Sequence, residues 1–331
     1  MHRVRRDRPA SIWTEEELLD GKRVLALAVV LRTSGCSWWK RTGGCAMCGY
    51  NASSSYPEIS EEDIVKQFEI AWQSFASHSI VKIYTSGSFL DDAEVPANAR
   101  DSILSKAGEA GVRLLFESRP EFVDKGVISR SLELCGDIEL AIGLESANDS
   151  VREESIRKGF SFGDYVRASE TAISLGAGIR TYLLLKPPYL TEEESISDAV
   201  SSISEASEYS RVISINPVNV QKRTVVDRLY RKGAFRSPWL WSIIRVLKSA
   251  DAGDAMLISS LVGAGSNRGP HNCGSCDRVA VQAIEAFNLT QDKAKLDVPF
   301  CECMDRWERN LSVEKFAISA GDHENYFSGI P

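Results

Sequence analysis

The chain contains 331 residues, of which 43% are hydrophobic and 26% are charged, a composition that supports a full core and excludes a disordered chain. Its formal net charge of −7 argues against a protein that coats nucleic acid non-specifically, although a local basic surface can still bind RNA. One large domain with an appendage fits this length.

The N-terminal stretch, residues 1–20, begins Met-His-Arg-Val-Arg-Arg, and we predict a basic extension ahead of the main domain. It has no apolar segment of the kind that a secretory signal needs. We therefore expect a cytoplasmic protein whose thiols stay reduced. No run of about 18 apolar residues occurs in the sequence, so we expect no membrane partner.

A glycine-rich loop with three cysteines follows the first apolar run. The cysteines are Cys36, Cys45 and Cys48. Three thiolates leave one iron of a [4Fe–4S] cluster open for a substrate, which points to chemistry at the metal rather than electron storage alone. The pair Cys45 and Cys48 also has the spacing of half a zinc site or of a redox pair, and both alternatives stay open at this point.

Short β-branched runs recur along residues 21–240, each followed by a helix-like stretch. This alternation predicts βα units with a parallel sheet. Six units are too few for a closed eight-stranded barrel, so we predict the α/β class with a partial (β/α)6 barrel whose active face lies at the carboxyl ends of the strands. The predicted strands are Val24–Leu31, Ile80–Tyr84, Val112–Glu117, Ile138–Leu144, Ile179–Leu185 and Val212–Asn219.

Two predicted helices have clear starts. Ser60 and Thr191 each place a hydroxyl at the N-cap position, and an acidic residue, Asp63 or Glu194, follows three positions later. This spacing is typical of a capping box.

Polar residues gather where the predicted strands end. Because these ends lie on one face of a barrel, the residues are expected to line a substrate-binding mouth. They are Ser86, Gly87 and Ser88 after the second strand, Glu117 after the third, Glu145 and Ser146 after the fourth, Lys186 after the fifth, and Asn216, Asn219 and Gln221 at the sixth. Asn219 and Gln221 share the alternation of one strand face if the sixth strand extends that far.

The last part of the chain, residues 241–331, is predicted to be a small module with a four-cysteine metal site. Its ligands are Cys273, Cys276, Cys301 and Cys303. Four thiolates in two close pairs satisfy the tetrahedral demand of structural Zn²⁺, and an auxiliary iron–sulfur cluster uses the same ligands. His271 is adjacent and is an alternative ligand. We favour zinc because CxxC turns with glycine are common zinc geometry.

The three-cysteine loop, the small-residue turn after the second strand and the six βα units together resemble the radical S-adenosylmethionine (SAM) superfamily over roughly residues 20–240. The chain departs from that pattern in two places. The first gap of the loop, residues 37–44, is longer than usual, and Met47 stands where an aromatic residue commonly precedes the last cysteine. A long first gap is also found in the radical SAM domain of elongator-type tRNA acetyltransferases.

Longer strings resemble a narrower group, the archaeosine-forming radical SAM enzymes of archaea (the RaSEA family). They include Gly43-Gly-Cys-Ala-Met-Cys-Gly-Tyr50, Asn216-Pro-Val-Asn-Val-Gln221 and Pro238-Trp-Leu-Trp-Ser242. This resemblance implies a lyase that cleaves a lysine C–N bond on lysine-adducted preQ0 in tRNA to form archaeosine. It also implies a lysine-transferase archaeosine synthase subunit as partner and an electron donor that the sequence does not identify.

The resemblance also implies roles for individual residues. Cys36, Cys45 and Cys48 would hold the [4Fe–4S] cluster. The turn Ser86, Gly87 and Ser88 would contact the amino group of SAM, although it lacks the acid that many relatives carry there. The remaining SAM contacts would be Glu117, Glu145, Ser146 and the cation Lys158.

Given the substrate that this resemblance implies, the amides Asn216, Asn219 and Gln221 are predicted to lie over the cluster and hold the modified base or its lysine arm, because neutral amides both donate and accept hydrogen bonds. Two other functions remain open. One is a radical SAM RNA methylthiotransferase or methylase whose C-terminal cysteines hold a second cluster. The other is a non-catalytic, zinc-stabilised RNA-binding scaffold.

Overall fold

The computed structural model describes residues 5–50 and 59–314. These residues fall into two compact units. The first unit contains the chain up to Gly44, Tyr50–Gly143 and Gly163–Arg180, and the second contains Cys45–Gly49, Leu144–Phe162 and the chain from Thr181 onward. The strands are ordered β1 to β8 in sequence order in one sheet, so the fold is the expected α/β partial barrel.

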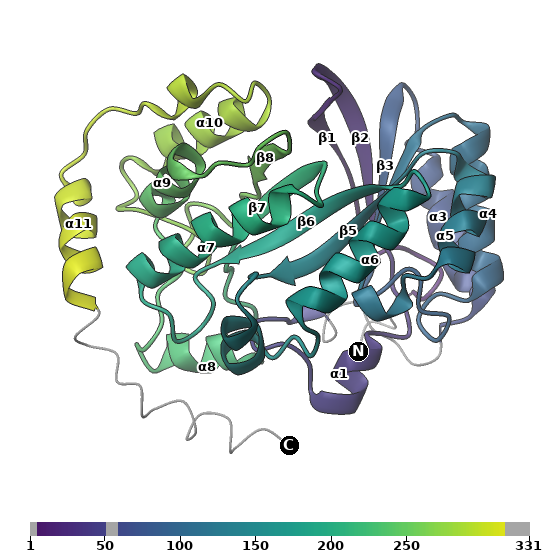
Figure 1. The fold of residues 1–331 in the computed structure, drawn as a ribbon, viewed down its shortest axis with the longest axis horizontal. Helices are drawn as coiled ribbons and strands as arrows, with labels where there is room; N and C mark the ends of the chain where they lie inside the picture. Colours follow the sequence, from purple (N-terminus) through teal and green to yellow (C-terminus); the bar gives the residue numbers. More distant parts are fainter. Residues whose placement is uncertain (1–4, 51–58, 315–331) are drawn as a thin grey trace. The chain divides into compact units, whose positions relative to one another are not determined.

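The helices and strands alternate along most of the chain (Figure 1). The strands are β1 (Ser11–Leu19), β2 (Lys22–Val30), β3 (His78–Tyr84), β4 (Arg113–Ser118), β5 (Ile138–Glu145), β6 (Gly178–Leu185), β7 (Val212–Pro217) and β8 (Met256–Ser259). The α-helices are α1 (Ser37–Thr42), α3 (Glu61–Trp72), α4 (Ala97–Glu109), α5 (Lys125–Cys135), α6 (Phe162–Ser174), α7 (Glu192–Ser207), α8 (Val225–Arg231), α9 (Leu240–Ser249), α10 (Asp277–Asn288) and α11 (Cys303–Val313). Short helices of other types are η1 (Pro120–Phe122), η2 (Val151–Ile156) and η3 (Lys293–Leu296).

The six predicted strands are all present, as β2 to β7. Two further strands were not predicted. β8 pairs parallel with β7, and β1 pairs antiparallel with β2 over residues that the sequence assigns to a basic extension. The β1 residues are rich in glutamate and lack the apolar pattern of an ordinary strand, which explains why the sequence does not predict this strand.

The first unit has helices α3, α4 and α5 beside its strands, with α3 next to α4 and α4 next to α5 (Figure 1). Residues Ala26 to Val29 of β2 and Leu114 to Phe116 of β4 are fully buried, as expected for strands of a parallel sheet covered on both faces. The predicted capping box at the start of α3 is confirmed, because Ser60 and Asp63 bond reciprocally to each other's backbone N–H groups.

A network of buried charges lies inside the first unit, on β1, β3, β5 and β6. Arg180 donates to both carboxylate oxygens of Glu17, at 2.7 and 3.2 Å, and to both of Glu139, at 3.3 Å each. Lys82 is paired with Glu17 and also with Glu15, the latter at 2.6 Å. Since these groups satisfy one another, the charges are tolerated away from water.

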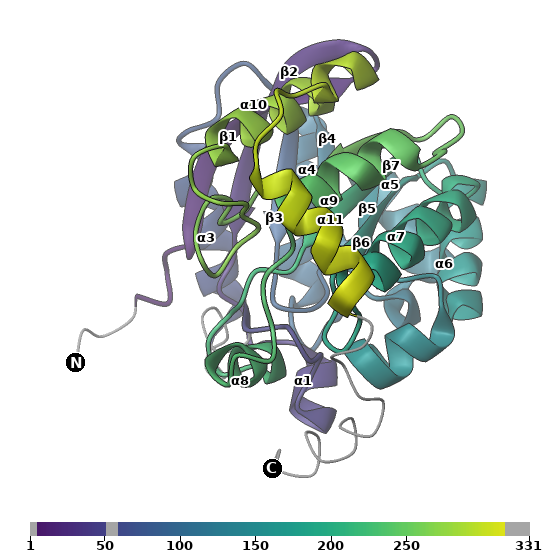
Figure 2. The same cartoon turned by 90° about the vertical axis from the view of Figure 1, so that its left-hand side faces the viewer.

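The second unit has its own apolar core. It consists of Ala46, Ile156, Leu184, Val218, Val220, Val225, Val226, Leu229 and Phe235. Helix α7 begins with the second predicted capping box, Thr191 with Glu194, which is also confirmed. Helix α7 contacts α9 and α11, and α10 contacts β8 and α9 (Figure 2).

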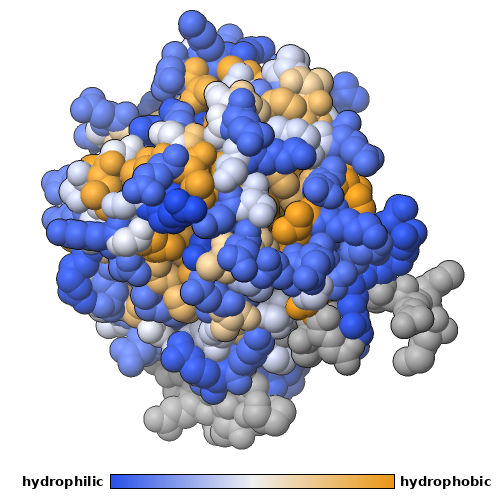
Figure 3. All heavy atoms as spheres, turned by 90° about the vertical axis from the view of Figure 1, so that its right-hand side faces the viewer, coloured by the Kyte–Doolittle hydropathy of each residue, from blue (hydrophilic) through white to orange (hydrophobic). Residues whose placement is uncertain are grey.

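Figure 3 shows the face that carries α3, α4 and α5, where hydrophilic residues cover most of the surface and apolar ones form separate patches. Within residues 5–50 and 59–314, none of the helices has the length and apolar character needed to cross a bilayer.

Candidate functional site

The first predicted cluster ligand, Cys36, lies in the first unit at the N-cap of α1. The turn that follows β3 approaches it closely. A Cβ atom added to Gly87 would lie 2.8 Å from both Cα and Cβ of Cys36 and 2.7 Å from a carboxylate oxygen of Glu94. Only glycine fits at this distance, so the structure brings the predicted SAM turn and one predicted cluster ligand into contact.

The turn itself is organised by Glu94, which the sequence did not single out. The N–H groups of Ser86 and Gly87 donate to Oε1 of Glu94 at 2.9 and 3.0 Å, and the N–H of Ser88 donates to Oε2 at 2.8 Å. The hydroxyl of Thr33 donates to Oε1 at 2.7 Å. Burial raises the pKa of Glu94, and these four hydrogen bonds oppose that shift. The buried carboxylate of Glu94 thus fixes the backbone of this turn.

The other two loop cysteines, Cys45 and Cys48, lie in the second unit and form one tight turn, in which the N–H of Cys48 donates to the carbonyl of Cys45 at 3.1 Å. Ala46 between them is fixed at both backbone groups. Its N–H donates to the carbonyl of Ile156 at 2.9 Å, and its carbonyl accepts from Val226 at 3.3 Å. The turn is therefore held by the backbone of two other segments of the same unit.

Gln221 anchors the end of that cysteine turn. Its Oε1 accepts the N–H of Gly49 at 2.7 Å, and a Cβ at Gly49 would lie 2.6 Å from the same oxygen. The side chain on which we predicted a substrate contact therefore already has a partner beside Cys48.

The extent of the sixth predicted strand was wrong. The strand was predicted to end at Asn219, but β7 ends at Pro217, because proline has no N–H to continue the ladder. The N–H of Val218 instead donates to Leu185, and that of Val220 donates to Arg268. Asn219 and Gln221 therefore lie in a loop, and strand alternation says nothing about their directions. Asn216 stays on the strand, where its Oδ1 accepts from Ser214 at 3.1 Å, and Asn219 lies against Gly263.

Of the remaining predicted SAM contacts, Glu117, Glu145 and Ser146 lie at the ends of β4 and β5, whereas Lys158 follows the short helix η2. In the second unit, Lys158 forms an ion pair with Glu145 at 2.7 Å, and both side chains are nearly buried. Ser146 donates to Asp198 at 2.8 Å. Burial raises the pKa of Asp198 to about 6, against the lowering effect of the Ser146 hydrogen bond. In the first unit, Glu117 accepts the N–H of Thr85 at 3.4 Å.

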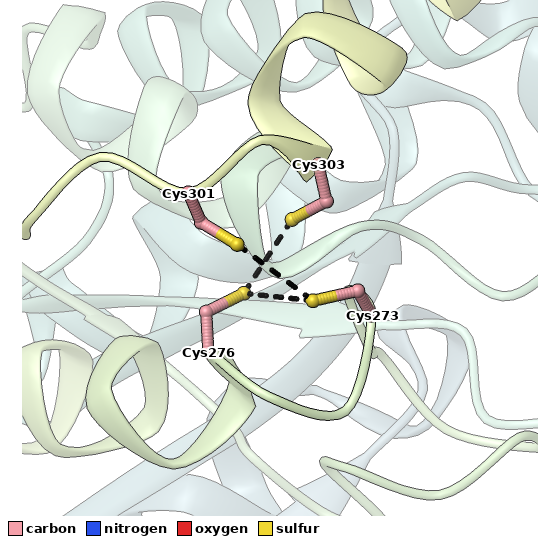
Figure 4. Close-up of side chains that lie close together, drawn as sticks. All are labelled: Cys273, Cys276, Cys301 and Cys303. Atoms are coloured by element: carbon pink, nitrogen blue, oxygen red, sulfur yellow. Dashed lines mark hydrogen bonds between the residues drawn. The ribbon is translucent and has the colours of Figure 1, made fainter.

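The four C-terminal cysteines converge on one point (Figure 4). Their Sγ atoms all lie within 4.8 Å of one another. Three pairs are separated by 3.5 to 3.8 Å. A tetrahedral ion with M–S bonds of about 2.3 Å requires S···S separations of about 3.8 Å. In a [4Fe–4S] cluster each cysteine binds a different iron, so the four Sγ atoms must lie farther apart than they do around a single ion. The spacing fits a single tetrahedral ion.

Hydrogen-bond donors surround these sulfurs. Nε1 of Trp241 donates to Sγ of Cys303 at 3.2 Å, and Nδ2 of Asn272 donates to Sγ of Cys276 at 3.5 Å. Such contacts orient metal ligands and stabilise thiolates. Burial acts to raise the pKa of Cys273, but hydrogen bonds from the backbone of Cys276 and Ser275 bring it down to about 6. His271 stands outside the four-sulfur set, and its Nδ1 lies 2.9 Å from the carbonyl of Gly269.

Helix α11 connects the metal site to the end of β6. The helix begins at the ligand Cys303, and Nε1 of Trp307 donates to Ser242 at 2.9 Å. Ser242 in turn donates to Glu192, which forms an ion pair with the buried Lys186 at 2.6 Å. Glu314, at the C-cap of α11, also contacts Lys186, at 3.3 Å. Lys186 has a φ of 64°, a left-handed conformation rare for a non-glycine residue.

Comparison with known proteins agrees with this geometry. No protein-family model matches the chain. Among solved structures, an archaeal Elp3 from Methanocaldococcus infernus superimposes with a TM-score of 0.50 at 14% identity, covering 69% of this chain and 59% of the other. The two proteins thus share a fold, which in this chain is a partial α/β barrel with a cysteine loop after its first parallel strand.

Two curated proteins match almost end to end, and both are described as archaeosine synthase subunit beta. The protein from Methanosarcina acetivorans is 42% identical over 316 residues, covering 93% of this chain and 91% of the relative. The protein from Thermococcus kodakarensis is 39% identical over 306 residues, covering 89% and 94%. The chain therefore belongs to the archaeosine synthase subunit beta family.

Proposed function

We propose that this chain is the radical SAM lyase of archaeosine formation, which cleaves a lysine C–N bond on lysine-adducted preQ0 in tRNA. The observation that carries the proposal is the 42% identity to an archaeosine synthase subunit beta over 93% of the chain. The contact between the SAM turn and Cys36 supports it, because this chemistry requires SAM beside the cluster.

Cys36, Cys45 and Cys48 would hold a [4Fe–4S] cluster, which supplies with bound SAM the radical that abstracts a substrate hydrogen. The turn at Ser86, Gly87 and Ser88 supplies acceptors for the SAM amino group. Its three N–H groups all donate to Glu94. Because a trans peptide places C=O opposite to N–H, the carbonyls of the same peptide groups point away from that carboxylate. In the proposed complex these carbonyls would accept from the ammonium group of SAM without an acid in the turn.

The remaining polar residues would divide between SAM and substrate. Glu117, Glu145, Ser146 and Lys158 would contact SAM, and the preformed pair of Glu145 and Lys158 offers one anionic and one cationic partner for an amino acid. Asn216 and Asn219 would hold the modified base or its lysine arm. Gln221 would contribute by holding the turn of Cys45 and Cys48 in place through its hydrogen bond with Gly49.

We propose structural Zn²⁺ at Cys273, Cys276, Cys301 and Cys303. The sulfur spacing supports one ion and disfavours the auxiliary cluster that a methylthiotransferase would need. Binding of zinc and folding of the module are then coupled. The proposed partners are tRNA, the lysine-transferase subunit of archaeosine synthase and an electron donor not yet identified, all in the cytoplasm.

An anaerobic assay for 5′-deoxyadenosine, with and without lysine-adducted tRNA, tests the function. We expect its formation to be coupled to cleavage of the lysine arm. SAM cleavage that ignores this tRNA would overturn the lyase assignment.

Metal analysis separates the alternatives. About four irons and one zinc per chain are expected for the lyase. About eight irons would favour the methylthiotransferase or methylase, and zinc alone would favour the non-catalytic scaffold.

A further inference from the structure

The long gap between Cys36 and Cys45 builds helix α1, which exposes an aromatic side chain beside two cations. The helix spans Ser37–Thr42 and buries none of its residues. Trp39 is 41% exposed, which is unusual for so large an apolar side chain. Lys40 and Arg41 follow it directly and are also exposed. The residues between two predicted cluster ligands therefore form a surface, which we call the α1 platform (Trp39, Lys40 and Arg41).

The indole of Trp39 is held in place although it is exposed. Gly43 ends α1 in the left-handed conformation, with its N–H donating to the carbonyl of Trp39 at 2.9 Å. The ring then packs on Gly44, where an added Cβ would lie 2.5 Å from Cδ1 of Trp39. A fixed ring loses little conformational entropy when a ligand stacks on it.

The α1 platform carries two cations, and one acid that contacts its helix is the buried Asp91, which accepts from the hydroxyl of Ser37. Neither Glu nor Asp occurs within α1. Trp38, the neighbour of Trp39, has the guanidinium of Arg41 at 5.7 Å and that of Arg119 at 5.1 Å from its ring centroid. Arg119 also pairs with Glu121 at 2.6 Å. Lys40 donates to the hydroxyl of Ser34 at 3.3 Å. Because a hydroxyl is neutral, this contact does not offset the positive charge of Lys40.

The other strongly exposed tryptophan of the first unit has different surroundings. Trp13 on β1 is 38% exposed, but its Nε1 donates to the carboxylate of Glu15 at 2.8 Å and its ring stacks on Tyr84. Helix α8 also carries cations in its last turn, Arg228 and Arg231, but Asp227 pairs with both Arg231 and Arg268. Within residues 5–50 and 59–314, Lys40 and Arg41 form no ion pair, so an exposed ring beside two cations distinguishes the α1 platform from both.

We infer that the α1 platform binds an unpaired nucleotide of the tRNA, with the base stacked on Trp39 and the flanking phosphates contacted by Lys40 and Arg41. The inference rests on the proposed function and adds to it a named RNA-contacting surface. Aromatic stacking combined with cations along a backbone is how proteins bind single-stranded nucleic acid. Because α1 follows Cys36 directly, a nucleotide bound to the α1 platform would lie close in sequence to this predicted cluster ligand.

The test measures the affinity of the full-length protein for a labelled tRNA transcript, with all variants matched for iron content. Trp39→Ala should weaken binding by about tenfold or more, whereas Trp39→Phe, which keeps a ring, should stay within a few-fold of the parent. Trp13→Ala, an equally exposed tryptophan beside an acid, is the matched control and should bind as the parent does. Lys40→Gln and Arg41→Gln should each lower the slope of log affinity against log salt concentration by nearly one, as expected for the loss of one phosphate contact.

The outcomes separate this inference from the proposed function. If the parent protein binds no tRNA, the proposed function fails. If the parent binds and Trp39→Ala binds equally well, or Trp13→Ala loses as much affinity, only the α1 platform is refuted. Weaker binding of the lysine-transferase subunit by Trp39→Ala, with tRNA affinity unchanged, would assign the surface to a protein partner and also overturn the inference.

Discussion

The buried charge network of the first unit gives a prediction about pH and stability. Glu17 on β1 is held by Arg180 through two hydrogen bonds and by Lys82. Burial acts to raise the pKa of Glu17, but the charges of Arg180 and Lys82 outweigh it and lower that pKa from 4.5 to about 2. At about 1.4 kcal/mol per pH unit, the ionised carboxylate adds about 3 kcal/mol to the free energy of unfolding.

The sign follows from the direction of the shift. Since the pKa is lower in the folded chain, the stabilisation is fully present above pH 4.5 and is lost as the pH falls toward 2. Glu17→Gln should therefore lower the free energy of unfolding by about 3 kcal/mol at pH 7, in the range found for breaking a buried ion pair. At pH 3.5 the difference from the parent should shrink to about 2 kcal/mol.

Urea unfolding at several pH values between 7 and 3.5 measures this difference. Glu16→Gln is the matched control, because Glu16 is the next residue of β1 and is exposed. Its effect should stay within about 0.5 kcal/mol at every pH. The reasoning is refuted if Glu17→Gln costs no more than Glu16→Gln at pH 7, or if its cost does not fall with acid.

Three further variants test the site. Cys45→Ala should lose cluster iron and SAM cleavage while keeping the fold, and full SAM cleavage after reconstitution with iron and sulfide would contradict the cluster assignment. Cys276→Ser should lose zinc and melt at a lower temperature yet keep its iron, whereas unchanged zinc content and melting would rule out a structural zinc site. Glu94→Gln, which brings an amide nitrogen toward backbone N–H donors, should weaken SAM binding by roughly tenfold in equilibrium dialysis, and parental affinity would show that the carboxylate is not needed.

The strands that the sequence predicted share one physical property, a short segment rich in apolar residues and long enough for a buried strand. β1 lacks it. Glu15 and Glu17 lie on the same face of β1, as residues two apart do in any strand. Their partners on that face are Lys82 on β3 and Arg180 on β6, both far away in the sequence. An ion network between distant strands leaves no local pattern, so a charged inner strand looks like a solvated segment.

The same distinction separates the cysteines that the sequence grouped correctly from Glu94, which it missed, and from Gln221, which it named without finding its contact with the cysteine turn. Cysteine spacing is local, and the four thiolates that meet in the C-terminal module are the four that the sequence grouped. Glu94 and Gln221 act instead by accepting backbone N–H groups, Glu94 from Ser86, Gly87 and Ser88, and Gln221 from Gly49. Because every residue except proline has a backbone N–H group, a sequence motif does not reveal which side chain accepts from it. The signal that remains is the glycine on the other side of the contact, because Gly87 and Gly49 each lack the room for a Cβ. In a loop that binds a cofactor through its backbone, glycines without room for a side chain therefore point to the acceptors that shape it.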